Sequence, residues 1–199
     1  MAKQLDQIRS DLHSSNADHR VAAVRQLAEQ RVWEALEEVV RLLEVDECGF
    51  SVAQALTAYG PEICKRTELE YTLFHPKKEV CYRAAWVLGF FGDQRAVKPL
   101  MDSLKEPFFH DHFLPMLKRL GVPDLERQMI RELSRHREST DHPAARYRSV
   151  TFFHALTQMQ SPAALELAPL FLREQHGALV RQHAQQYLTV VAPDKRNQA

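Results

Sequence analysis

Hydrophobic residues recur along the chain with the spacing of amphipathic helices. Between Trp33 and Asp46 the apolar positions lie three or four residues apart, and charged residues occupy the positions between them. The same arrangement returns at residues 97–104 and 125–133. This spacing places the apolar side chains on one face of a helix. No stretch alternates apolar and polar residues for long enough to predict a strand, so we expect an all-α protein.

These helices are expected in pairs, because one pattern repeats about every thirty residues. In its clearest copy, Ala84 and Leu88 precede Gly92, and a second apolar series follows Asp93. The corresponding leucines lie 29 to 39 residues apart, at Leu27, Leu56, Leu88, Leu117, Leu156 and Leu188. A repeat of this length without strands is typical of stacked helix pairs, in which each pair buries its apolar face against the next.

Glycine, proline and aspartate mark the expected boundaries. Gly60, Gly92 and Gly121 stand where a helix should end, and a proline or an aspartate then begins the next one. The expected elements are a helix near 3–14, pairs near 18–30/33–45, 48–59/61–74, 78–91/94–105, 108–120/123–137 and 143–159/162–174, and a last helix near 177–191. Three prolines fall inside these helices and should kink or shift them, namely Pro99, Pro115 and Pro169.

The stretch from Val80 to Leu104 resembles the HEAT-like repeat of phycobilisome (PBS) lyase proteins and their bacterial relatives. That repeat joins a first helix of the type Val-Arg-x-x-Ala-x-x-x-Leu-Gly to Gly-Asp-x-x-Ala and a second apolar helix. The residues that match it here are Ala84, Leu88, Gly92, Asp93 and Ala96, with Arg20, Ala23 and Leu27 near the start and Val180, Arg181, Ala184 and Leu188 near the end. The matching positions are packing positions, so the resemblance assigns no catalytic residue.

We therefore expect a right-handed α-solenoid of about five stacked HEAT-like helix pairs with terminal capping helices. The N-terminal cap should occupy residues 1–16, the solenoid residues 17–192 and a polar tail residues 193–199. The resemblance implies that the second helices of the pairs line a concave groove. Stacked pairs of this kind leave an extended curved surface on which a partner can bind.

Polar rows on the second helices supply the candidate binding residues. Three arginines share one helix, and arginine is the charged residue most often found at binding hot spots. The candidate partner-binding residues are Arg127, Arg131, Arg135, Lys98, Asp102, Glu37 and Arg41. The alternative is that these rows are solvated helix faces, whose i,i+4 ion pairs contribute a few tenths of a kcal/mol each.

The charge balance narrows the class of partner. The chain holds 26 basic and 26 acidic residues, so its formal net charge is zero, yet residues 33–74 contain nine acids and three bases. A nucleic-acid binder of this size would carry a basic excess, so we expect no nucleic-acid partner. No apolar run reaches the roughly 20 residues that cross a bilayer, and residues 1–12 lack the apolar segment of a secretory signal. We therefore expect a cytoplasmic protein with no membrane association.

The residues that could carry chemistry do not form a recognisable site. Cys48, Cys64 and Cys81 form no CxxC pair, and we expect reduced structural thiols in helices. His110 and His112 would point about 200° apart on a helix and could not share one ion. No His-Glu dipeptide of the kind found in helical-repeat di-iron hydroxylases occurs. We expect no catalytic residue, no metal and no cofactor.

Two hypotheses for the function remain. The first is a non-enzymatic protein–protein interaction module, acting as a scaffold, adaptor, assembly factor or immunity-type binding protein. The alternative, which the resemblance allows, is a bilin lyase-like protein that attaches or detaches a tetrapyrrole. A dense run of phenylalanines could be core packing or a partly exposed patch for a partner or an apolar ligand, and it comprises Phe90, Phe91, Phe108, Phe109 and Phe113.

Overall fold

The computed structural model describes residues 2–45, 47–104, 110–122, 124–138 and 140–192. Within these ranges the chain forms eleven α-helices joined by 3-10 helices and turns, and it contains no strand. The prediction of an all-α protein is confirmed. The chain divides into two compact units, unit 1 (Met1–Leu100) and unit 2 (Met101–Ala199).

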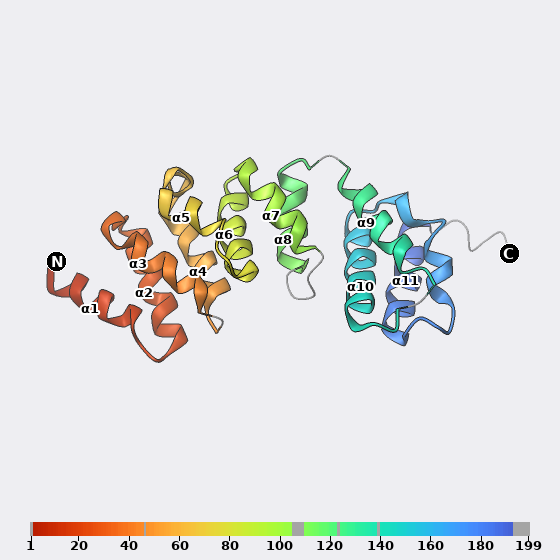
Figure 1. Cartoon of the computed structure of the whole chain (residues 1–199), viewed down its shortest axis with the longest axis horizontal. Helices are drawn as coiled ribbons and strands as arrows, with labels where there is room; N and C mark the ends of the chain where they lie inside the picture. The colour runs from red at the N-terminus through yellow and green to blue at the C-terminus, as the bar shows by residue number, and fades with distance from the viewer. Residues whose placement is uncertain (1, 46, 105–109, 123, 139, 193–199) are drawn as a thin grey trace. The chain divides into compact units, whose positions relative to one another are not determined.

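Unit 1 is built from helix pairs in two layers. Its first helices are α2 (Ala17–Glu29), α4 (Gly49–Leu56) and α6 (Lys78–Phe90). They pack in succession, with α1 (Ala2–Leu12) on the outer side of α2 (Figure 1). The second helices form the other layer, where α3 (Leu36–Arg41) packs against α5 (Thr67–Thr72). This is the layering that stacked helix pairs require.

The small residues of the repeat lie where the pattern predicts. Ala84 and Ala184 are fully buried, and Ala23 is almost so. Leu27 and Leu88, four residues later in their helices, are also fully buried. A small side chain lets a neighbouring helix approach closely, so the repeated alanine is a packing position, as expected.

The residue three positions before each buried alanine ties its helix to the preceding turn. The repeat motif has an arginine at this position, and in the third copy Cys81 takes its place. Each side chain donates a hydrogen bond to a backbone carbonyl five or six residues earlier. The three bonds are Arg20 Nη1 to Ser14 O (2.6 Å), Cys81 Sγ to His75 O (2.9 Å) and Arg181 Nη1 to His176 O (3.0 Å). These motif residues therefore hold the fold and are not free to bind a partner.

Unit 2 surrounds the long helix α10 (Pro143–Gln158). α10 packs against α8 (His110–Arg119), α9 (Leu125–Arg135) and α11 (Ala178–Val191), and Figure 1 shows α10 and α11 side by side. Their core contains Phe153, whose ring stacks edge to face on Phe171 at 5.1 Å. The buried hydroxyl of Tyr187 donates to Ser161 O (2.7 Å) and accepts from Ala164 N (3.0 Å), so no polar atom of this ring is left without a bond.

Two second elements differ from the continuous helices that the sequence predicts. Residues 61–74 form a 3-10 helix (Pro61–Lys65) and α5, separated by Arg66 in an extended conformation. At this interruption the Arg66 guanidinium lies over the Trp33 ring, 4.3 Å from its centroid. Residues 162–174 form only two 3-10 helices, Pro162–Ala164 and Ala168–Leu172. Pro169 lies in the second, where it removes a backbone donor that a longer α-helix would need.

The other two prolines are accommodated in helices. Pro99 lies in the first turn of α7 (Val97–Ser103), just after a 3-10 turn at Gln94–Ala96. The first N–H groups of a helix have no partner within the helix, so a proline is tolerated there. α8 continues through Pro115.

The cysteines are less uniformly buried than expected. Cys48 is buried, but it precedes α4 instead of lying within it, while Cys64 and Cys81 are half-buried. Burial raises the pKa of the Cys64 and Cys81 thiols, so both favour the protonated form. All three are free thiols.

Candidate functional site

A hollow opens on unit 1 between the second helices α3 and α5. Its volume is about 470 Å³. Val40 and Val80 are the buried apolar residues of its lining, and polar side chains supply most of the rest. The lining residues are Glu37, Val40, Arg41, Glu44, Thr67, Glu68, Tyr71, Thr72, His75 and Val80. The helix period produces this arrangement, because α3 turns its apolar side inward and Glu37 and Arg41 outward, as predicted.

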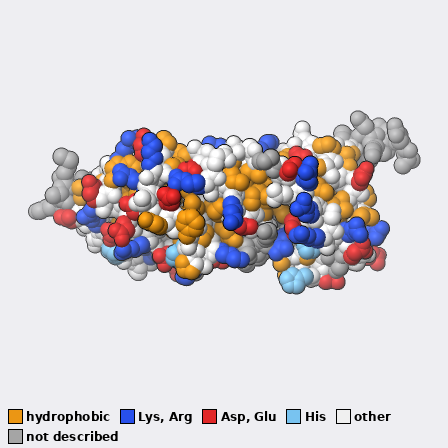
Figure 2. Space-filling view, turned by 45° about the horizontal axis from the view of Figure 1, so that its top comes forward, with side chains coloured by type: hydrophobic (Ala, Val, Ile, Leu, Met, Phe, Trp, Pro, Cys, Tyr) orange, Lys and Arg blue, Asp and Glu red, His pale blue; other side chains and the backbone are white. Residues whose placement is uncertain are grey.

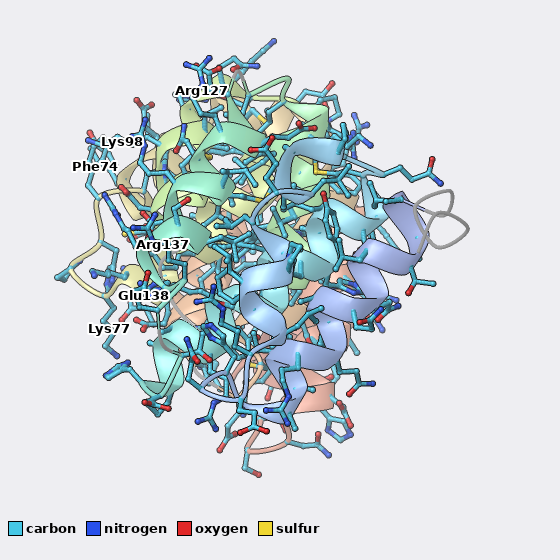
Figure 3. The ribbon with its side chains drawn as sticks, turned by 90° about the vertical axis from the view of Figure 1, so that its right-hand side faces the viewer. Phe74, Lys77, Lys98, Arg127, Arg137 and Glu138 are labelled. Atoms are coloured by element: carbon cyan, nitrogen blue, oxygen red, sulfur yellow. The ribbon has the colours of Figure 1, made fainter. Side chains whose placement is uncertain are left out.

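Two large aromatic side chains stand exposed beside this hollow. Tyr71, in the last turn of α5, is 75% exposed and lines the hollow, and Phe74, just after the helix, is 81% exposed. Figure 3 shows Phe74 projecting away from the ribbon. Leu69, two residues before Tyr71, is fully buried. Residues two apart on a helix point to opposite sides, so burial of Leu69 turns Tyr71 outward.

A second hollow lies on the other side of α3, next to α1. Its volume is about 460 Å³, and its lining residues are Leu12, His13, Glu34, Glu37, Glu38, Arg41 and Leu42. Glu37 and Arg41 line both hollows and form an ion pair of 2.5 Å. We call the two hollows together, with Tyr71 and Phe74, the acidic surface of unit 1.

Carboxylates outnumber permanent cations on this acidic surface. Arg41 is the one arginine or lysine in the linings of the two hollows, against five glutamates, Glu34, Glu37, Glu38, Glu44 and Glu68. The remaining polar partners are histidines, with His13 Nε2 2.7 Å from Glu38 Oε1 and His75 Nε2 3.6 Å from Glu44 Oε1. The surface therefore offers a negative potential to a partner.

The predicted arginines all lie on the exposed face of α9 in unit 2. Arg127 forms an ion pair with Asp124 at 3.4 Å, and Arg135 forms one with Glu132. Arg131 forms no ion pair with any residue that the structure describes. Figure 3 shows Arg127 projecting outward. On the face seen in Figure 2, acidic, basic and hydrophobic side chains are interspersed.

The structure divides the arginine row between two hollows. Arg131 and Arg135 line one of about 230 Å³ over Met101, Met129 and Phe152. Arg127 lines another, of about 610 Å³, whose lining also includes Lys118, Val122, Asp124, Leu125, Glu126, Ile130 and Met159. Residues four apart on an α-helix are offset by about 40°, so Arg127 and Arg135 differ by about 80° around the axis. The three arginines therefore face two neighbouring sites.

The remaining candidate residues are spread over α3 and α7. Glu37 and Arg41 lie on the acidic surface of unit 1, whereas Lys98 and Asp102 lie on α7. Lys98 is exposed and Asp102 half-buried.

The described members of the phenylalanine run are buried or half-buried. Phe113 is fully buried, and Phe90 and Phe91 are half-buried with their rings edge to face at 5.1 Å. Phe108 and Phe109 lie outside the described residues. The exposed aromatic patch lies instead at Tyr71 and Phe74, which the sequence interpretation missed. For Tyr71, the available signal was its position on the helix face opposite Leu69.

The described residues contain no group of three or more His, Cys, Asp or Glu side chains that could hold a metal ion. The side chains of His110 and His112 lie outside that part. His154 on α10 and His183 on α11 face each other, with ring centroids 6.2 Å apart. Burial, and to a lesser degree the neighbouring His154, lower the pKa of His183.

Comparison with known proteins agrees with the repeat architecture. A search of the curated proteins finds no match. None of the helices in the described ranges combines the length and the hydropathy of a membrane-spanning segment. The family model of the PBS lyase HEAT-like repeat matches residues 80–106, a stretch that contains α6 from Val80 onward and the whole of α7. The chain therefore contains a helical repeat of the PBS lyase HEAT-like type, as its sequence predicts.

Proposed function

We propose that this helical repeat protein is a non-enzymatic module that binds another protein through the outer faces of its second helices. The observation that carries the proposal is the exposure of Tyr71 and Phe74 beside a hollow of about 470 Å³. Aromatic side chains dominate the energetics of protein interfaces, because they bury a large area with little loss of conformational freedom. Large exposed aromatic side chains next to a hollow mark an interaction site, so Tyr71 and Phe74 would form the centre of the interface.

The scaffold supports this role. Buried first helices fix the position of α3 and α5, so the hollows are held by packed elements. A partner then binds to a surface that is already formed, which reduces the ordering cost of association. The arginine face of α9, and Arg131 above all, is a second contact site in this proposal.

The three free thiols are compatible with a reducing compartment, and we place the module in the cytoplasm. A role as scaffold, adaptor, assembly factor or immunity-type binding protein fits the same surface. Each of these roles requires a stable complex with another protein.

The test is affinity capture from the native host, with bound proteins quantified by mass spectrometry. The double variant Tyr71→Ala, Phe74→Ala should retain at least tenfold less of the partner, because hot-spot truncations commonly cost about 2 kcal/mol or more. The control is Leu179→Ala, a 52% exposed apolar residue on α11, which should retain the partner. Capture that neither the aromatic pair nor the double variant Arg131→Glu, Arg135→Glu reduces would contradict the proposal.

A bilin lyase-like protein should behave differently. It should bind free bilin and shift the visible absorption of the chromophore. We expect no shift when the purified protein is mixed with bilin. A shifted spectrum followed by transfer of the chromophore to an acceptor protein would replace the binding-module proposal.

A further inference from the structure

The acidic surface of unit 1 has the composition of a site for a positively charged segment. Its two hollows are lined by five glutamates and one arginine. That arginine, Arg41, is already paired with Glu37. A partner that carries arginine or lysine would meet carboxylates on both sides of this ion pair. An acidic or phosphorylated partner would meet repulsion at the same positions.

The exposed aromatic rings favour the same kind of ligand. A guanidinium or ammonium group above an aromatic face is attracted by the ring's quadrupole. Unit 1 already contains one such contact, because Arg66 lies 4.3 Å from the centre of the Trp33 ring. Tyr71 offers an exposed ring next to Glu68, so one incoming arginine could stack on the ring and bond the carboxylate. The aliphatic stem of that arginine could lie against Phe74.

The layout of the hollows favours an extended segment over a single side chain. The two hollows have similar volumes, of about 470 and 460 Å³, and they share Glu37 and Arg41 on α3. A peptide that crosses α3 would place side chains in both hollows, one toward α5 and one toward α1. Tyr71 lines the hollow between α3 and α5 and not the one next to α1, so the two ends of a bound segment would meet different surfaces.

From these three observations we propose that the acidic surface of unit 1 binds an arginine- or lysine-bearing peptide segment of the partner. Tyr71 and Phe74 supply the aromatic contacts, and Glu37, Glu44 and Glu68 supply the charge. This inference rests on the proposed function, since it names the chemistry of the partner that the module would bind. The arginine face of α9 remains a second contact site, of the opposite charge.

The test begins with display of random 12-residue peptides against the full-length protein. Enriched sequences should be rich in arginine and lysine. Fluorescein-labelled copies of the best peptide are then titrated with the protein, and affinity is read from fluorescence anisotropy. Binding should weaken as salt rises, because the carboxylates of the surface are exposed.

Variants then locate the site. Tyr71→Ala should weaken binding at least tenfold, whereas Tyr71→Phe, which keeps the ring, should bind nearly as the parent does. The double variant Glu37→Gln, Glu68→Gln should weaken binding several-fold and flatten its salt dependence. Glu126→Gln, a glutamate in a hollow of unit 2, is the matched control and should change nothing. Circular dichroism of each variant serves to check that it remains folded.

Several results would overturn the inference. Enrichment of acidic or uncharged peptides, or of no peptides, would show that the acidic surface does not bind a basic segment. Basic peptides that bind equally to Tyr71→Ala and to Glu37→Gln, Glu68→Gln would show that the site is wrong. Self-association of the protein that Glu37→Gln, Glu68→Gln abolishes would show that a second copy covers this surface.

The failure of the inference can be separated from that of the proposed function. Partner capture that survives the Tyr71 and Glu37 variants but is lost in Arg131→Glu, Arg135→Glu would overturn the inference and leave the binding module standing. Capture that no surface variant reduces would overturn both.

Discussion

The two units use one repeat pattern but differ on their outer faces. In unit 1 the second helices α3 and α5 carry glutamates with few cations and expose Tyr71 and Phe74. In unit 2 the second helix α9 carries three arginines, two of which already have a carboxylate partner on or next to the same helix. Packing constrains only the inward positions of a repeat, so the outward positions are free to diverge toward different partners.

The units also differ in their histidines. Three histidines of unit 2 have pKa values lowered mainly by burial, His136, His176 and His183. His176 is fully buried, with Nδ1 3.2 Å from Thr140 Oγ1 and Nε2 3.0 Å from Arg137 O. This ring ties the segment after α9 to the turn before α11. Unit 2 therefore depends on neutral imidazoles for part of its stability.

Overpacking the small core position should destabilise each unit most. Ala84→Leu in unit 1 and Ala184→Leu in unit 2 should each cost about 1–3 kcal/mol, because neither buried site has room for a larger side chain. Thermal unfolding measures the loss, and hydrogen exchange shows which unit loosens. Ala58→Leu, at an exposed position, is the control. A melting temperature unchanged in Ala84→Leu would mean that the repeat register is wrong.

A substitution at Gly49 tests the role of the buried Arg83 in unit 1. A Cβ at Gly49 would lie 2.3 Å from Arg83 Nη1 and 2.8 Å from Leu43 O, two atoms joined by a hydrogen bond of 2.5 Å. Gly49→Ala should displace the Arg83 guanidinium and break its charge-assisted hydrogen bond to Leu43 O. Because both groups are buried, the free energy of unfolding should fall by about 1–3 kcal/mol. Gly92→Ala would be a poor control because of its positive φ, so Ser51→Ala on the exposed face of α4 serves instead. A variant as stable as the parent would show that Arg83 can move without loss.

Mild acid should weaken unit 2 before unit 1. His136, His176 and His183 have a lower pKa in the folded protein than their ordinary value near 6.5. The contribution of each neutral imidazole to stability is therefore complete above pH 6.5. It is lost as the pH falls below 6.5, because the unfolded chain then binds the proton more readily. Hydrogen exchange at pH 7.5, 6.5 and 5.5, corrected for intrinsic rates, should show earlier loss of protection in α10 and α11 than in α2 and α4. In His176→Gln the dependence on pH should be smaller. Equal loss of hydrogen-exchange protection in both units would contradict the proposed difference in their sensitivity to acid.

Helix capping offers a smaller contrast between the units. Asp93 accepts from Arg95 N at 3.0 Å and holds the Arg95 side chain, whose hydrogen bonds lower the pKa of the Asp93 carboxyl. Asp124, at the corresponding start of α9, makes no capping bond and has a left-handed backbone. Asp93→Ala should cost about 1 kcal/mol, and Asp124→Ala a few tenths, as measured by urea unfolding. A larger loss of stability in Asp124→Ala than in Asp93→Ala would show that Asp124 is the more important cap.

Charge reversal on α9 should have the smallest effect on stability. Arg131 and Arg135 are exposed, so the double variant Arg131→Glu, Arg135→Glu should stay within about 0.5 kcal/mol of the parent in urea unfolding. The same variant then reports on binding without the complication of unfolding. A loss of several kcal/mol would show that this arginine face holds the fold.

Periodicity was sufficient for much of this description, because burial in a helix pair follows a fixed spacing. The inward positions of α3 and α9, the buried Ala84 and the turn at Gly92 all follow from local sequence. The outward positions of Arg127, Arg131 and Arg135 follow from the same period. Local hydrogen bonding and side-chain pattern specify these features without reference to distant residues.

Tertiary contacts decided the rest. The contact of Arg66 with Trp33 joins residues 33 positions apart, and the hydrogen bond of Cys81 depends on the path of the preceding turn. Phe74 follows the end of α5 and stays exposed, although the sequence predicts a helix through this residue. Sequence alone determined which side of each helix is buried, because that depends on a period within the helix. Only the folded structure determined which outward side chains gather around one hollow, because that depends on neighbours far apart in the chain.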